Sequence, residues 1–181
     1  MQQRNVSSQS QVPGGPTPAG CASAGTGRLL PDATLPTASG TSMSLDWYSG
    51  RRNLVVVLLG APAPDDEVAR LLSQLAQGRA ALRDEEAEVL VVAAGAAGDA
   101  TGAPKGPYTM LIDPDASFHR CMSAMDSAGD IAPAVVITDR FREIYHTFRP
   151  PDPPWPPTVE EVVSWLVFMN IQCPECGAPE W

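Results

Sequence analysis

Two cysteines near the end of the chain have the spacing best suited to chemistry. Cys173 and Cys176 stand in the phrase Cys-Pro-Glu-Cys-Gly. Thiolates at this spacing can face one metal ion, usually zinc or iron, or they can close a disulfide. Because a closed tetrahedral site needs four ligands, the pair alone is half of a metal site. The spacing therefore supports two hypotheses, a metal knuckle and a redox dithiol, beside a third in which the pair has no function.

The sequence around the pair bears on this choice. The C-P-x-C-G phrase resembles the knuckle of rubredoxins and zinc ribbons, and C-P-x-C also resembles the glutaredoxin-like active site. In the second class the motif begins a helix, whereas here it follows one, so the negative helix pole and Glu175 both disfavour a bare thiolate. A metal ion would overcome that penalty with its own charge. The missing ligands could be His119 and Cys121, or the same cysteine pair from a second copy or from another protein.

The other cysteines are isolated. We interpret Cys21 as an incidental thiol without a role. Cys121 is a possible resolving thiol for Cys173 and Cys176. Four cysteines are too few and too unevenly spread for a fold built on disulfides. No apolar stretch is long enough to span a membrane, and residues 1–27 contain no apolar segment of the kind that a secretory signal needs, so a cytoplasmic location is expected. The net charge of -9 disfavours nucleic acid as a partner.

The composition divides the chain into three parts. Residues 1–27 are rich in Ser, Gln, Pro and Gly and are expected to be disordered. Residues 28–172 have the apolar content of one globular domain, and residues 173–181 form a tail that carries the cysteine pair.

The order of apolar runs predicts an α/β domain. The apolar run 54–59 predicts a buried strand, and after Gly60, Pro62 and Pro64 the acids Asp65, Asp66 and Glu67 predict the first turn of one long helix that reaches Leu82. A second buried strand at 89–92 gives a β-α-β unit and hence a parallel pair. Further predicted elements are a strand at 108–113, a short helix carrying His119 and Cys121, a hairpin of 134–138 with 143–148, and a last helix opened by a Thr158–Glu161 capping box.

Three phrases carry a resemblance to a known family. They are Gly27-Arg-Leu-Leu-Pro-Asp-Ala-Thr-Leu-Pro36, Leu111-Ile-Asp-Pro-Asp-Ala116 and Ala132-Pro-Ala-Val-Val-Ile-Thr-Asp139. Together with the order of elements they resemble the peroxiredoxin family of alkyl hydroperoxide reductase and thiol-specific antioxidant type. The resemblance implies a thioredoxin-like fold, with a central mixed sheet and helices on both faces. It also implies that Pro133 is the cis-proline that such folds place beside the active site.

The chain departs from that family where its chemistry resides. The resemblance implies a catalytic cysteine at the helix after the central strand, but residues 62–69 contain no Cys, Ser or Thr, and Pro133 stands where an arginine is usual. We therefore expect no peroxidase activity by the family's mechanism. The first hypothesis is a protein-binding or assembly module whose Cys173 and Cys176 bind zinc or iron or contact a partner, either another protein or a second copy. The alternative is a thiol-disulfide oxidoreductase that uses Cys173, Cys176 and Cys121.

Overall fold

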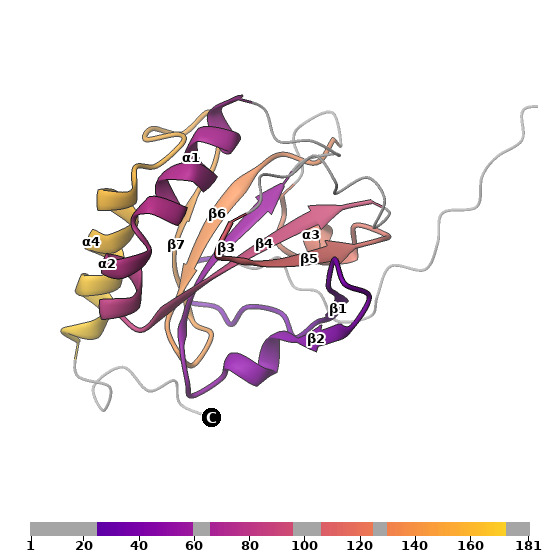
Figure 1. Cartoon of the computed structure of the whole chain (residues 1–181), viewed down its shortest axis with the longest axis horizontal. Helices are drawn as coiled ribbons and strands as arrows, with labels where there is room; N and C mark the ends of the chain where they lie inside the picture. The colour runs from indigo at the N-terminus through magenta and orange to yellow at the C-terminus, as the bar shows by residue number, and fades with distance from the viewer. Residues whose placement is uncertain (1–24, 60–65, 96–105, 125–129, 173–181) are drawn as a thin grey trace, which may run out of the picture.

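The computed structural model describes residues 25–59, 66–95, 106–124 and 130–172 (Figure 1). In chain order, its elements are β1 (Thr34–Pro36), β2 (Ser42–Ser44), the 3-10 helix η1 (Leu45–Tyr48), β3 (Asn53–Leu59), α1 (Asp66–Gln77), α2 (Arg79–Asp84), β4 (Ala87–Ala94), β5 (Thr109–Asp113), α3 (Ser117–Cys121), β6 (Ala134–Thr138), β7 (Ile144–Phe148) and α4 (Val159–Asn170). Of the segment 1–27 that is expected to be disordered, residues 1–24 lie outside the described residues, as does the whole tail 173–181.

The main sheet is mixed and has the strand order β5-β4-β3-β6-β7. β3 is central, with β4 parallel on one side and β6 antiparallel on the other. All seven residues of β3 are buried, as the uninterrupted apolar run predicts for a strand that is covered on both faces. The parallel pair and the hairpin of β6 with β7 are both confirmed.

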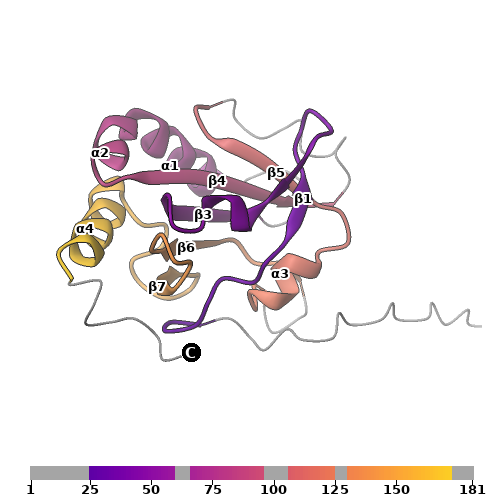
Figure 2. The ribbon, with the colours of Figure 1, turned by 90° about the horizontal axis from the view of Figure 1, so that it is seen from below.

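Helices cover both faces of this sheet, and alternate residues of each strand point to opposite layers. Val55 and Val57 pack under α1, α2 and α4, whereas Leu54 and Val56 pack under η1, α3 and the small β1–β2 sheet. Figures 1 and 2 show α4 and α1 together on one side and α3 on the other. The predicted thioredoxin-like α/β fold is confirmed.

Smaller local predictions can be compared with the structure as well. The Thr158–Glu161 capping box is present at the start of α4. Asp139 holds the β6–β7 turn, because its Oδ1 accepts the N–H groups of Phe141 and Glu143 at 2.9 and 2.8 Å. The N–H of Gly27 donates to the Ile144 carbonyl at 2.8 Å, so contacts with the domain already begin just before residue 28.

Among the described helices, none is long and apolar enough to cross a membrane.

The one long helix expected after β3 is instead two helices, α1 and α2, which meet at Gly78. Gly78 has a ψ of 7°, away from the helical value, and its N–H donates to the Gln74 carbonyl at 2.8 Å. A Cβ placed on Gly78 would collide with the side chain of Val159 at the start of α4. The break therefore lets α4 approach the junction of the two helices closely, which hydrophobic spacing alone did not indicate.

Replacing Gly78 with alanine is expected to lower the free energy of unfolding by about 1–3 kcal/mol, because the new methyl group overpacks the contact with Val159. Urea denaturation measures the change. The paired variant Gly78→Ala/Val159→Ala removes the collision and should recover part of the loss. If the alanine variant is as stable as the parent chain, the contact with Val159 is not tight. Without a collision, replacing Gly with Ala would be expected to stabilise the folded chain, because Ala has less conformational freedom when unfolded.

Candidate functional site

The helix start after β3 is where the resemblance implies a catalytic cysteine. Residues 60–65 lie outside the described residues, and α1 begins with Asp66 and Glu67, which are exposed, followed by the buried Val68. Two carboxylates therefore stand in the first turn of α1, where unpaired N–H groups and the positive helix pole stabilise negative charge. The expectation of an acidic helix start is confirmed for the part that the structure describes.

The peptide bond before Pro133 does not have the predicted geometry. Within the described residues, the cis peptide bonds precede Pro151, Pro154 and Pro156, and the Ala132–Pro133 bond is not among them. The prediction of a cis bond at Pro133 is therefore wrong. Trans is the ordinary form for an X–Pro bond, and Pro133 directly precedes β6, where its missing N–H costs no ladder hydrogen bond.

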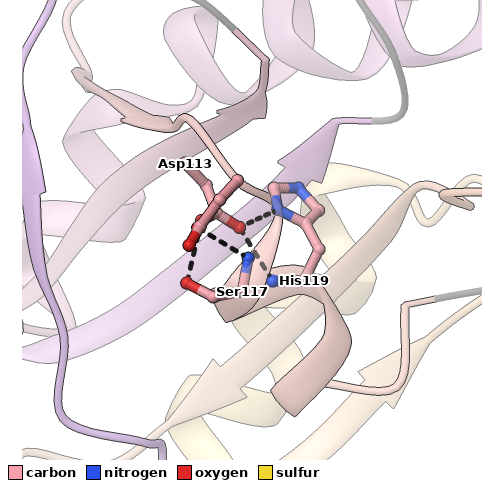
Figure 3. A network of polar contacts seen from close by, with 4 residues as sticks. Asp113, Ser117 and His119 are labelled. Atoms are coloured by element: carbon pink, nitrogen blue, oxygen red, sulfur yellow. Dashed lines mark hydrogen bonds and ion pairs between the residues drawn. The ribbon is translucent and has the colours of Figure 1, made fainter. Parts of the chain in front are cut away.

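A buried polar cluster joins the end of β5 to α3 (Figure 3). Asp113, the last residue of β5, accepts hydrogen bonds on Oδ2 from the backbone N–H of His119 at 2.9 Å and from the His119 ring Nδ1 at 2.7 Å. Its Oδ1 accepts a longer bond from the Ser117 hydroxyl at 3.4 Å. The side chains of Asp113 and His119 are both fully buried. The strand end and the short helix are thus fixed to each other by one carboxylate.

The electrostatics of this cluster leave one nitrogen without a hydrogen bond. Burial raises the pKa of the Asp113 carboxyl, but the hydrogen bonds and charge of His119 outweigh it, and the pKa ends below its ordinary value. The ionised carboxylate requires a proton on Nδ1 of His119. Nε2 of His119 is buried and has no hydrogen-bond partner within the described residues. In the tautomer that carries its proton on Nδ1, Nε2 is an acceptor.

The far end of α3 is held by Arg149, which follows β7. Its guanidinium donates to the carbonyls of Met122 and Ser123, both at 2.8 Å, and thereby satisfies groups that a helix end leaves unpaired. Burial lowers the pKa of Arg149 from its ordinary value. Since Asp113 holds one end of α3 and Arg149 the other, the backbone that carries Cys121 is fixed from both sides.

Among the described residues Cys121 is the only cysteine, and its sulfur forms a disulfide bond. Its side chain is only 6% exposed. Cys21, Cys173 and Cys176 all lie outside the described residues, so the structure does not describe the partner sulfur. The predicted role of Cys121 in thiol chemistry thus concerns a sulfur that is already bonded.

The structure brings together only some of the predicted site residues. His119 and Cys121 share α3, but no group of three or more His, Cys, Asp or Glu residues in the described part of the chain could hold a metal. The zinc or iron site at Cys173 and Cys176 stays a prediction. His146 lies on the edge strand β7, and its ring stacks on that of Trp165 with 4.2 Å between the ring centroids.

Sequence reasoning missed the Asp113–His119 pair. It placed Asp113 in a family phrase and at the opening of a short helix, and it considered His119 as a possible metal ligand beside Cys121, but it did not indicate that the two side chains meet. The available signal was an acid at the predicted end of a strand with a histidine on the following short helix, a placement that allows the carboxylate to cap the helix and reach the ring.

The fold and the described site define a thioredoxin-like domain of the redoxin class. The redoxin family model matches residues 25–164, and the chain belongs to this family. A search of curated proteins gives no match.

Solved structures support the same fold. The chain is similar to the peroxidoxin BcpB of Mycobacterium tuberculosis, with a TM-score of 0.69 and 12% identity over 83% of this chain and 99% of that one. It is also similar to AhpC of Mycobacterium tuberculosis, with a TM-score of 0.67 and 14% identity over 82% of this chain and 99% of that one. The chain is similar as well to the reduced 2-Cys peroxiredoxin of Plasmodium vivax, with a TM-score of 0.66 and 12% identity over 80% of this chain and 96% of that one. At these identities the likeness concerns the fold.

Proposed function

We propose that this redoxin works as a protein-binding or assembly module and not as a peroxidase of the family's usual kind. The observation that carries the proposal is the start of α1, where Asp66 and Glu67 occupy the first turn and no cysteine occurs between Cys21 and Cys121. The usual reaction needs a thiolate at this helix start, because the helix N-terminus lowers the thiol pKa there. Carboxylates use the same helix pole for their own stabilisation, by about 0.3–1 kcal/mol each.

The outer side of α4 supports a binding role. Val167, Phe168 and Ile171 are 39%, 47% and 75% exposed, and they lie directly before the cysteine pair in sequence. Large apolar side chains gathered on one surface favour contact with another protein or with a second copy of the chain. In the proposal, Cys173 and Cys176 extend this surface by binding zinc or iron, or by contacting the partner directly.

Metal analysis after anaerobic purification of the full chain tests this proposal, with Cys173→Ser/Cys176→Ser as the matched variant. We expect about one zinc or iron per chain or per pair of chains, lost in the variant, together with association that weakens in Phe168→Ser/Ile171→Ser. Leu29→Ser is the control for association, because Leu29 is also 50% exposed but lies far from α4 in sequence. Metal-free protein whose tail disulfide is turned over by a thioredoxin system would contradict the proposal.

A second candidate function is thiol-disulfide exchange. The observation that favours it is the disulfide at Cys121, on a helix that Asp113 and Arg149 hold at its two ends. In such an exchange a thiolate attacks one sulfur of the disulfide, a mixed disulfide forms, and the other sulfur leaves as a thiolate. Cys173 and Cys176 would supply or receive the disulfide. Stoichiometric metal without a reducible disulfide would exclude this candidate.

A further inference from the structure

A small hollow lies between α2, the start of β4 and the segment before β5, away from the Asp113–His119 cluster. Its volume is about 100 Å³, and its polar lining consists of Arg52, Arg79, Arg83, Glu88 and Tyr108. Pockets for drug-sized ligands usually have about 300–1,000 Å³. The hollow therefore suits an ion or a single small group.

Three arginines give this hollow an excess of positive charge. Arg79 and Arg83 are four residues apart on α2, so their side chains share one face, and Arg52 joins them from the residue before β3. Within the part of the chain that the structure describes, no ion pair joins any of the three to a carboxylate. Like charges at this spacing destabilise a helix by a few tenths of a kcal/mol. This charge is concentrated in a chain with only 12 basic residues and a net charge of -9.

Glu88 is the one acidic residue in the lining of the hollow, and it favours an anion that also carries a hydrogen-bond donor. One carboxylate against three guanidinium groups leaves an excess of positive charge. A carboxylate can accept a hydrogen bond only if the ligand brings a donor, such as the O–H of a singly protonated phosphate. Guanidinium groups bind phosphate oxygens through paired hydrogen bonds.

We propose that this hollow binds a phosphate group, held by Arg52, Arg79 and Arg83. The group could be free inorganic phosphate or the phosphoryl end of a larger monoester, since both present the same oxygens. No cysteine is among the residues that line the hollow, and the proposal does not depend on the proposed function.

The test measures binding of inorganic phosphate and of phenyl phosphate to the full chain by calorimetry, at constant ionic strength maintained with NaCl. We expect saturable binding with a Kd on the order of 1 mM. Arg79→Gln/Arg83→Gln should weaken binding about tenfold or more. Arg70→Gln is the matched control, because Arg70 is an exposed helix arginine outside the hollow, and it should bind as the parent chain does.

Each arm of this experiment has a defined meaning. Binding of both probes assigns the site to the free ion as well as to esters, and binding of phenyl phosphate alone assigns it to a phosphorylated ligand. Circular dichroism of each variant confirms that it is folded. The proposal is overturned if neither probe binds more tightly than chloride, or if Arg79→Gln/Arg83→Gln binds as tightly as Arg70→Gln.

Discussion

Asp113→Asn is expected to lower the free energy of unfolding by about 3–5 kcal/mol, because it removes the carboxylate of the fully buried Asp113–His119 pair. Asparagine keeps one acceptor oxygen and has an NH2 group in place of the other, so either the two donors of His119 or the hydroxyl of Ser117 lose their acceptor. Urea denaturation at neutral pH measures the loss. Asp115→Asn is the matched control: Asp115 is exposed and accepts only the Ser117 N–H at 3.1 Å, so its cost should stay below about 1 kcal/mol.

The same pair predicts a pH dependence. The pKa of Asp113 is lowered on folding, so the carboxylate stabilises the fold above its ordinary pKa of 3.8, and this contribution is lost as the pH falls through the lower folded value. Asp113→Asn should therefore flatten the stability curve below about pH 4. The pair does not hold α3 to β5 if Asp113→Asn lowers the free energy of unfolding by less than about 1 kcal/mol at neutral pH, or if the variant loses stability below about pH 4 as steeply as the parent chain does.

Reduction of the Cys121 disulfide is expected to lower the free energy of unfolding by about 2–4 kcal/mol, because an unfolded chain without the cross-link has more conformations. Denaturation with and without a thiol reductant measures the difference. Cys121→Ser should show the lower stability under both conditions and no response to the reductant.

Single serine variants of Cys21, Cys173 and Cys176 identify the partner, since the chain has four cysteines. One of the three should behave as Cys121→Ser does. A parent chain that is equally stable with and without reductant would contradict the prediction. A partner at position 173 or 176 would favour thiol-disulfide exchange over a metal knuckle, because a bonded sulfur is not free to bind metal as a thiolate.

The sequence predicted those parts of the fold that local patterns determine. The apolar run of β3 and the β-α-β order determine a parallel pair, and the Thr158–Glu161 phrase determines a helix start. The break at Gly78 was not predictable in this way, because it depends on the approach of Val159 from a distant helix. Pro133 was assigned a cis bond by resemblance alone, and the structure has no such bond there.

The site was less predictable than the fold. The carboxylate of Asp113 meets the ring of His119 because a strand end and a short helix are packed together, and hydrophobic spacing says nothing about such polar pairs. The disulfide of Cys121 could not be predicted either, since the pairing of cysteines depends on distances in the folded chain and not on their order. By contrast, the acidic start of α1 was predictable from composition, because acids favour the first turn of a helix.

The central claim is that this redoxin does not use a thiolate at the start of α1. Its most direct test is hydrogen peroxide reduction by the full chain, supplied with a thiol reductant, beside the variant Cys121→Ser/Cys173→Ser/Cys176→Ser. We predict no peroxide consumption above the rate of the reductant alone in either protein. Rapid, saturable peroxide reduction that survives in the triple variant would contradict the account.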